Sequence, residues 1–238
     1  MTELIRFDQV SYRYPGGQDV LSEVGLSIAQ GEMVYVTGPS GAGKTTLLRL
    51  IAVLCRANRG QIVVMGQNLS ALKPSRVPAF RQRIGMVFQN FNLLHDRTVF
   101  DNVALPLVIR GYSHEDVGRR VRAALDSVGL LKKERVLPLT LSGGEQQRVG
   151  IARAIVTKPA LILADEPTGN LDPEMALEVM RGFQRFNDAG VTVMIATHAI
   201  DLIDALPHRI IHLEHGHITD KLPTAASRLK GGMRDGLR

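Results

Sequence analysis

The stretch Gly38-Pro39-Ser40-Gly41-Ala42-Gly43-Lys44-Thr45 fits the pattern G-x-x-x-x-G-K-[ST] at every fixed position. The apolar run from Glu32 to Thr37 precedes it and is typical of a buried strand, and the run from Thr45 to Ile51 opens a helix. In this setting, glycines let backbone amides wrap the β- and γ-phosphates of a nucleotide, while the lysine adds a point charge and the threonine hydroxyl is a Mg²⁺ ligand. The stretch therefore predicts an α/β nucleotide-binding fold that holds the phosphates of a nucleotide together with Mg²⁺.

A second candidate anion site is Leu141-Ser142-Gly143-Gly144-Glu145-Gln146-Gln147, which indicates a two-glycine turn that opens a helix. Unpaired N–H groups at a helix N-terminus and the helix dipole both attract negative charge. Since one chain carries two different phosphate-binding segments, we expect each to serve a different nucleotide.

An acidic pair follows Ala160 to Ala164, an apolar run suited to a fully buried parallel strand. In a doubly wound sheet, the carboxyl ends of the strands meet the bound phosphates, so Asp165 and Glu166 are expected beside the Gly38–Thr45 loop. Asp165 is a candidate Mg²⁺ ligand, and Glu166 is a candidate for orienting the water that attacks the γ-phosphate. An acidic pair at a strand end is more often a solvated loop, but the loop upstream favours the catalytic interpretation.

These motifs resemble, in order and spacing, those of the ATP-binding cassette (ABC) ATPases, and the resemblance covers about Leu4 to Asp220. It implies hydrolysis of ATP to ADP and phosphate. Gln89 corresponds to the family's glutamine that links the metal and the γ-phosphate to a membrane partner, and His198 corresponds to the switch histidine. The segment Gly169-Asn170-Leu171-Asp172 corresponds to the D-loop.

The candidate site residues fall into three sets. The candidate catalytic residues are Lys44, Gln89, Glu166 and His198, and the candidate Mg²⁺ ligands are Thr45, Gln89 and Asp165. The candidate nucleotide-binding residues are Tyr14, Gly38, Pro39, Ser40, Gly41, Ala42, Gly43, Lys44, Thr45, Thr46, Ser142, Gly143 and Gly144. Tyr14 stands where the family places an aromatic ring that stacks on adenine, and Tyr12 is its local alternative.

Two positions depart from the family pattern. Ala199 follows the histidine at 198, where an aspartate is common, and this puts in question how tightly the histidine loop is held. The stretch Ile51-Ala52-Val53-Leu54-Cys55 lacks the glycine commonly found after the helix that follows the phosphate loop, and we expect an effect on local packing only.

The resemblance and the periodicity together predict an α/β P-loop NTPase fold of the ABC nucleotide-binding type. Its mixed-sheet core would comprise about residues 1–89 and 157–220. A helical region at about 90–156 would be inserted in that core. Strand patterns at Ile5–Val10 and Val20–Ile28 indicate a small antiparallel sheet on one side, and the pattern at Pro173–Asp188 predicts a helix.

Composition adds constraints on compartment and partners. One cysteine, Cys55, favours a reducing compartment over a disulfide framework. Neither a signal peptide nor a membrane-spanning apolar run is expected. The net charge is +6, and residues 221–238 carry five basic residues against one acid, which gives +4. This basic tail is expected to be mobile and either functionally silent or attracted to anionic membrane surfaces; nucleic-acid binding is not expected.

His212, His215 and His217 lie in two short predicted strands around a glycine turn, with His212 and Glu214 on one face. Metal binding is the less favoured interpretation of this cluster, because surface histidines in a terminal hairpin explain it adequately.

Segments after Gln89, notably Phe91 to Leu107, resemble the cell-division branch of the ABC ATPases. The resemblance implies a head-to-tail dimer of two copies, with two ATP molecules sandwiched between them. It also implies an integral membrane partner, a peripheral location of this chain on the cytoplasmic side of the bacterial inner membrane, and coupling of ATP cycling to cell-wall hydrolysis in division. Three alternatives stay open: a lipoprotein-releasing or macrolide-type exporter subunit, a soluble ABC ATPase acting on DNA or ribosomes, and a division scaffold with little need for hydrolysis.

Overall fold

The structure, a computed structural model, describes residues 2–169 and 171–221, the last two as backbone only. The predicted basic tail therefore lies outside the described residues apart from the backbone of its first residue, and so does Asn170 of the D-loop. Within the described ranges, no helix is both long enough and apolar enough to span a bilayer.

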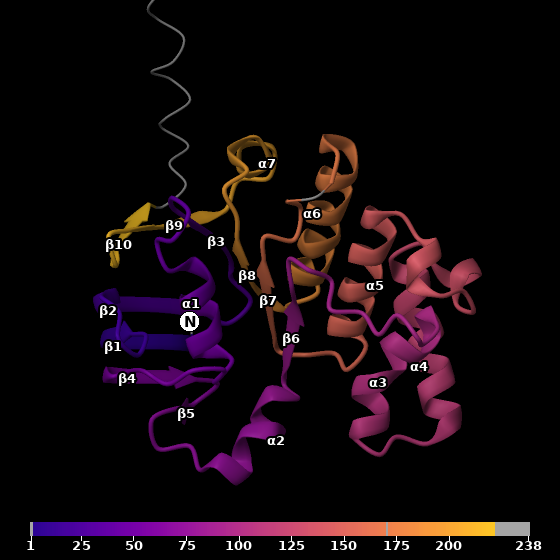
Figure 1. Ribbon diagram of the computed structural model, residues 1–238, viewed down its shortest axis with the longest axis horizontal. Coiled ribbons are helices and arrows are strands. Elements are labelled where there is room, and N and C mark those ends of the chain that lie inside the picture. The colour runs from indigo at the N-terminus through magenta and orange to yellow at the C-terminus, as the bar shows by residue number, and fades with distance from the viewer. Residues whose placement is uncertain (1, 170, 222–238) are drawn as a thin grey trace, which may run out of the picture.

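A six-stranded sheet with the strand order β10-β9-β3-β8-β7-β6 organises the nucleotide-binding core (Figure 1). Its strands are β3 (Met33–Thr37), β6 (Ile84–Val87), β7 (Leu161–Asp165), β8 (Thr192–Ala196), β9 (Arg209–Glu214) and β10 (His217–Lys221). Neighbouring strands run parallel, except that β9 and β10 form an antiparallel hairpin. The sheet is thus mixed, as predicted, and the strands predicted at 32–37 and 160–164 are confirmed to within one residue.

Helices cover both faces of this sheet, which explains why β7 and β8 are almost continuously apolar. On one face, α1 (Lys44–Ile51) packs Leu47 and Ile51 into a cluster with Leu161, Leu163 and Met194. On the other face, α6 (Pro173–Asp188) packs Val179, Met180 and Phe183 against the alternate strand residues. Asp172 caps α6, accepting a hydrogen bond from the Met175 N–H at 2.9 Å. Short helices α2 (Val77–Arg81) and α7 (Ile200–Ala205) complete the core, with a 3₁₀ turn at Pro74–Arg76 before α2.

A second, antiparallel sheet with the order β2-β1-β4-β5 lies beside α1 (Figure 1). Its strands are β1 (Glu3–Arg13), β2 (Asp19–Ala29), β4 (Arg59–Val64) and β5 (Gln67–Asn68). The first two were predicted as shorter strands, and β4 and β5 were not predicted. The alternating burial of β2 directs Leu21, Val24, Leu26 and Ile28 into the same apolar cluster as α1.

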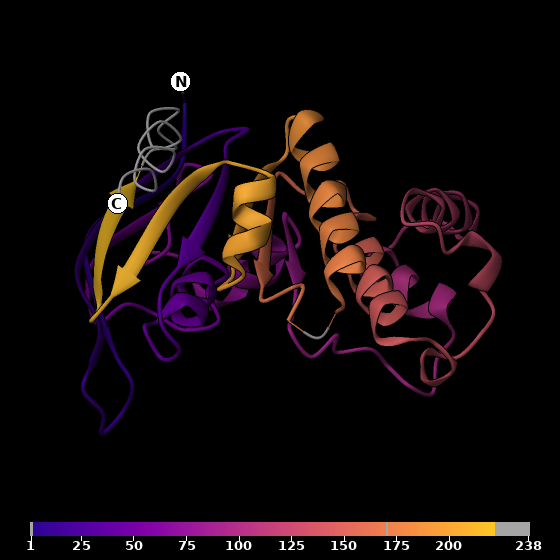
Figure 2. The same ribbon diagram turned by 90° about the horizontal axis from the view of Figure 1, so that it is seen from above.

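Between β6 and β7 the chain forms three helices with an apolar cluster of their own, seen as a separate lobe in Figure 2. These are α3 (Val99–Ile109), α4 (His114–Ser127) and α5 (Gly143–Ile155), with 3₁₀ turns at Leu131–Lys133 and Pro138–Thr140. Thr98 and Ser113 cap α3 and α4 with their side-chain oxygens, as small hydroxyl residues commonly do.

Helix α5 belongs to both parts of the molecule. Val149 and Ala152 pack in the cluster of the helical lobe. Ile151 and Ala154, on another side of the same helix, pack with the central sheet and α6. Movement of the lobe relative to the core would therefore have to involve this helix.

Val53, just after α1, has a φ of 56°, a left-handed conformation that is strained for a β-branched residue. This is the segment in which the sequence lacks the family's glycine. The Arg81 guanidinium donates hydrogen bonds to the carbonyls of Ala52 at 3.1 Å and Val53 at 2.7 Å. An arginine from α2 therefore holds the strained backbone of this segment in place.

Candidate functional site

A cavity of about 610 Å³ lies where β3, β7 and β8 end. Its lining consists of Tyr14, Val20, Gly38, Pro39, Ser40, Gly41, Gly43, Lys44, Thr45, Thr46, Gln89, Glu166 and His198. Every residue of the lining except Val20 was a predicted site residue. The fold therefore brings the phosphate loop, Glu166, Gln89 and His198 together from separate segments.

Two glycines of the phosphate loop are required by the backbone and by close packing. Gly38 has a φ of 142°, and a Cβ there would lie 2.0 Å from the Leu213 carbonyl oxygen of β9. Gly43 has a φ of 103°, and a Cβ there would lie 3.0 Å from Val20. Since any side chain would collide at Gly38, the hairpin of β9 and β10 forms a fixed base for the loop.

Lys44 is held over the loop by the loop's own carbonyl groups. Its ammonium donates hydrogen bonds to Gly38 O at 2.8 Å and Pro39 O at 3.1 Å, and it lies 4.0 Å from Glu166 Oε1. Only about a tenth of its side chain is exposed. A cation that is buried and positioned in this way is available to the phosphate oxygens of a nucleotide.

Thr45 and Asp165 bring two oxygen ligands together. The threonine hydroxyl donates a hydrogen bond to Asp165 Oδ1 at 3.1 Å. Burial raises the pKa of the Asp165 carboxyl above its usual range, although its bond to Thr45 and the charges of Arg49 and Lys44 act in the opposite direction. A hydroxyl and a carboxylate at this spacing match the oxygen ligands that Mg²⁺ prefers, and a bound dication would favour the charged carboxylate.

Glu166 lies between the lysine and the histidine of the site. Its φ is 46°, and its N–H donates to the Ala196 carbonyl at 2.9 Å, which anchors it to the end of β8. His198 Nδ1 lies 3.0 Å from Glu166 Oε2, while 71% of the histidine side chain is exposed. The N–H of Ala199 donates to Thr197 Oγ1 at 3.1 Å, so the histidine loop is tied down without an aspartate at 199.

Tyr14 lies at the mouth of the cavity. Its hydroxyl lies 3.1 Å from the hydroxyl of Thr46, and its ring meets that of Tyr12 edge to face, with the centroids 4.9 Å apart. Tyr12 is buried in the core and does not line the cavity, and burial raises the pKa of its hydroxyl. The geometry therefore favours Tyr14 over Tyr12 as the aromatic ring available to a base.

The segment after Gln89 is held in an unusual conformation by a residue that sequence reasoning missed. Phe91 and Asn92 have φ values of 37° and 49°, both left-handed. The guanidinium of Arg153, on α5, donates to Phe91 O at 2.7 Å and to Asn92 O at 2.6 Å. Burial lowers the pKa of Arg153 from its usual value. Its separation of about sixty residues from this loop left no local signal in the sequence.

The second phosphate-binding segment opens α5 with a capping box. Ser142 is the N-cap: its hydroxyl accepts from the Glu145 N–H at 3.3 Å, and the Glu145 carboxylate accepts from the Ser142 N–H at 3.1 Å. Lys133 also pairs with Glu145, and this bond is the largest cause of a lowered Glu145 pKa. The two glycines thus form the first turn of the helix itself, rather than a turn before it.

Ser142 and Gly143 are exposed, whereas Gly144 is buried and a Cβ there would meet the Met175 side chain at 2.3 Å. None of the three lines the cavity described above. Within one chain, the structure therefore keeps the two phosphate-binding segments apart.

In the terminal hairpin, His212 contacts a threonine and a glutamate. His212 Nδ1 lies 3.0 Å from Thr37 Oγ1, just before the phosphate loop, and His212 Nε2 lies 3.7 Å from Glu214, which confirms the predicted shared face. Across the described ranges, no group of three or more His, Cys, Asp or Glu side chains is arranged to hold a metal.

Comparisons with known proteins agree with this geometry. The model of the ABC transporter family matches residues 21–169. The cell division ATP-binding protein FtsE of Escherichia coli (strain K12) is 53% identical over 215 residues, which cover 90% of this chain and 97% of that protein. The FtsE protein of Haemophilus influenzae is 50% identical over 216 residues, covering 90% and 99%. A solved dimer of an ATP-binding cassette in a post-hydrolysis state, bound to ADP and Pi, has a TM-score of 0.85 at 33% identity and covers 92% of this chain and 99% of that one.

Proposed function

The chain belongs to the ABC transporter family and to its FtsE branch, and on that premise we propose that it hydrolyses ATP to act on an FtsX-type membrane partner in cell division. The observation that carries the enzymatic part is the position of Glu166. Its carboxylate lies at the cavity between Lys44 and His198, where a water positioned for attack on a γ-phosphate could be oriented.

The residues of the cavity divide the work of phosphoryl transfer. Backbone amides of the Gly38–Thr45 loop and the Lys44 ammonium bind the β- and γ-phosphates, while Tyr14 stacks on the adenine. Thr45 Oγ1 and Asp165 Oδ1 would hold Mg²⁺ together with Gln89, and the metal would neutralise charge on the phosphate oxygens. Glu166 orients the attacking water, and His198, whose Nδ1 lies 3.0 Å from Glu166 Oε2, holds Glu166 in place.

We propose that a second copy of the chain completes the site. Ser142 and Gly143 are exposed at a capped helix N-terminus, yet they lie outside the cavity of their own chain. A head-to-tail dimer would place this terminus against the γ-phosphate held by the partner's loop, where N–H groups and the helix dipole favour negative charge. The solved cassette with the same fold is itself dimeric, which supports this arrangement.

The membrane partner is proposed to dock beside Gln89. A groove of about 420 Å³ there runs between α2, β6 and α3, and its lining is mostly apolar. Ile109 of α3 lies in it with 67% of its surface exposed, and Leu105 lies beside it. The FtsE relatives support a division complex at the cytoplasmic face of the inner membrane over the exporter alternatives.

Replacing Glu166 with glutamine tests the enzymatic proposal. Glu166→Gln keeps the size of the side chain but removes the base, so ATP turnover should fall by about 100-fold or more. ATP binding should persist, and the variant should accumulate as a dimer with ATP in size-exclusion chromatography. Turnover within twofold of the unsubstituted chain, or full turnover by a monomer, would overturn the assignment. Co-purification of the unsubstituted chain with its membrane partner tests the proposed membrane complex separately from the enzymatic activity.

A further inference from the structure

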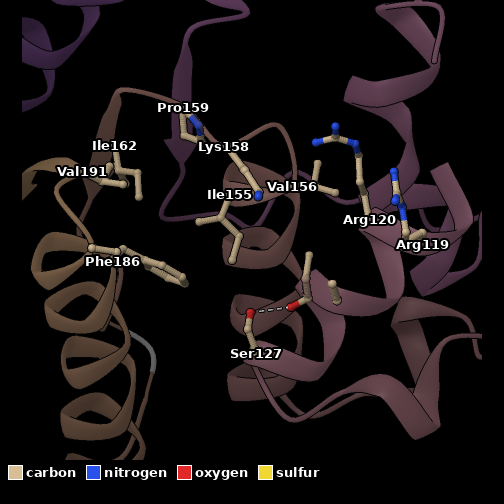
Figure 3. A pocket seen from close by; sticks show the side chains of 13 residues that line it. Arg119, Arg120, Ser127, Ile155, Val156, Lys158, Pro159, Ile162, Phe186 and Val191 are labelled. Carbon is tan, nitrogen blue, oxygen red and sulfur yellow. Dashed lines mark hydrogen bonds between the residues drawn. The ribbon is translucent and has the colours of Figure 1, made fainter. Parts of the chain in front are cut away.

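A larger cavity, of about 790 Å³, lies away from the nucleotide site, at the seam between the helical lobe and the core (Figure 3). One side is formed by α4 and the end of α5, and the other by the C-terminal part of α6 and the starts of β7 and β8. Its size falls within the range of small-molecule sites, roughly 300–1,000 Å³. The proposed ATPase function uses none of the residues that line it.

The lining has one sign of charge. It contains Arg119, Arg120 and Lys158, and no carboxylate is among its residues. Arg119 pairs with Asp116, a residue outside the lining, so its charge is partly neutralised. Arg120 and Lys158 carry the net positive charge of the cavity.

Neither of these residues has a carboxylate or hydrogen-bonding partner for its side chain among the described residues. The Arg120 Nε atom is buried and donates no hydrogen bond, and the guanidinium carbon lies 4.8 Å from the centre of the Tyr112 ring. No ion pair or side-chain hydrogen bond joins Lys158 to any residue in the described ranges. Lys158 is an exposed residue, but the buried Nε–H of Arg120 is costly to leave unpaired and calls for an acceptor from elsewhere.

Lys158 also occupies an unusual backbone position. Its φ is 51°, a left-handed conformation at which glycine or asparagine is the ordinary choice after a helix end. The chain therefore has a long cationic side chain at a position where the left-handed backbone favours glycine. Figure 3 shows its ammonium directed toward the opening beside Ile155 and Val156.

The rest of the lining is apolar. Ile155, Ile162, Phe186 and Val191 form most of it, and Figure 3 shows Phe186 and Ile155 pointing toward one another across the space. A purely polar anion such as phosphate would leave this surface unmatched, and a neutral hydrocarbon would leave the buried Nε–H of Arg120 without an acceptor. The occupant that satisfies both has an anionic head and an apolar body.

We propose that this seam is a binding site for a free amphipathic anion, an acyl carboxylate, with Arg120 and Lys158 binding the carboxylate and Phe186 and its neighbours contacting the acyl chain. Such a ligand would contact α4 of the lobe and α6 of the core at once. This inference is independent of the proposed function.

Calorimetric titration of the full chain tests the site with three probes: decanoate below its micelle-forming concentration, uncharged 1-decanol, and acetate. We expect decanoate to bind at one site per chain, and the other two probes to bind at least tenfold more weakly. No decanoate binding, or equal binding of decanol, would overturn the proposal.

Three variants locate the site. Lys158→Glu should weaken decanoate binding at least tenfold by reversing a charge at the head group, and Ala123→Trp should do so by filling the cavity from an exposed position of α4. Lys132→Glu makes the same change of charge at an exposed residue outside the lining and should leave binding unchanged. Equal affinity in all three would place the ligand elsewhere. Binding of phosphatidylglycerol vesicles that depends on Lys158, without any binding of free decanoate, would replace the free anion with a membrane surface and overturn the proposal.

Discussion

The guanidinium of Arg153 bridges the carbonyl of Phe91 at 2.7 Å and that of its neighbour Asn92, and so ties the last turn of α5 to the loop that follows Gln89. Both carbonyls belong to residues with left-handed backbone conformations. The planar fork of an arginine can donate to two acceptors at once, which a lysine cannot do with fixed geometry. The loop at the proposed membrane-partner groove is therefore held by the same helix that begins with Ser142.

Arg153→Lys should consequently affect coupling more than chemistry. We expect basal ATP turnover to change by less than about threefold, while stimulation by the membrane partner falls by roughly tenfold, because the loop is no longer held in one conformation. Turnover of the purified chain with and without the reconstituted partner measures the difference. Arg181→Lys, on the exposed face of α6, is the matched control and should change neither. Equal loss of basal and stimulated turnover in Arg153→Lys would contradict the coupling role.

Ser142→Arg tests action across the dimer. In mixed dimers with one substituted subunit, the bulky cation should disable the ATP held by the other subunit's loop. Combining it with Lys44→Ala on the same or on the opposite subunit distinguishes the two arrangements. With both changes on one subunit, both ATP sites are damaged in the head-to-tail model. Lys44→Ala damages the site at that subunit's own phosphate loop, and Ser142→Arg damages the site at the other subunit's loop. With the changes on different subunits, both defects fall on a single site and the second site stays intact. Single-turnover hydrolysis should therefore survive only in the second arrangement; the opposite pattern would show that Ser142 acts on its own chain's nucleotide.

Asp165→Asn should raise the thermal stability of the nucleotide-free chain at neutral pH, while abolishing Mg²⁺-dependent turnover. Burial raises the pKa of this carboxyl in the folded chain. A group whose folded pKa is raised contributes stability that is present below its unfolded pKa and lost as the pH rises through its folded pKa. The advantage of the asparagine should therefore grow as the pH rises through the folded pKa and disappear at low pH. Melting temperatures of both proteins across this range measure it, and a constant difference would rule out the titration as the cause.

Two glycines, Gly150 in α5 and Gly85 in β6, should respond oppositely to alanine. A Cβ at Gly150, inside α5, would meet only the Phe91 carbonyl oxygen at 3.9 Å, an ordinary contact. Gly150→Ala should therefore stabilise the fold by about 0.5–1 kcal/mol through helix propensity. A Cβ at Gly85, in β6, would lie 2.6 Å from the Ala154 carbonyl oxygen, so Gly85→Ala should destabilise by roughly 1–3 kcal/mol. Denaturant unfolding of both variants gives the two signs; destabilisation by Gly150→Ala would mean that α5 packs more tightly than described.

The parts of the site that were predictable from sequence are those whose chemistry is local. The phosphate loop needs closely spaced glycines and a lysine, and Asp165 and Glu166 lie at the end of an apolar strand, so one segment of sequence carries each signal. Arg153 could not be predicted, because its function depends on carbonyl groups about sixty residues away and any exposed arginine on a helix has the same sequence pattern. The strained conformation of Val53 could not be predicted either. The sequence shows that a glycine is absent from this segment, but it does not show which residue stabilises the backbone there.

The fold shows the same distinction between features with a local sequence signal and features that depend on long-range contacts. Strands β3, β7 and β8 were predictable because burial on both faces makes them continuously apolar. Strands β4 and β5 were missed, since the first half of β4, up to Gln61, is exposed and β5 has only two residues. The order of the strands depends on long-range pairing, and it was not predicted from the sequence.

Helix α5 has 13 residues and therefore spans about 20 Å. One end presents the serine proposed to sense another copy's nucleotide, and the other holds the loop beside the membrane-partner groove. A helix that is held at both ends moves as a rigid body. A displacement of one end of α5 must therefore displace the other end by a similar distance. The timing of ATP hydrolysis in one subunit would then reach the membrane through the partner subunit's helix, so each cycle would produce a joint mechanical stroke of two chains rather than two independent ones.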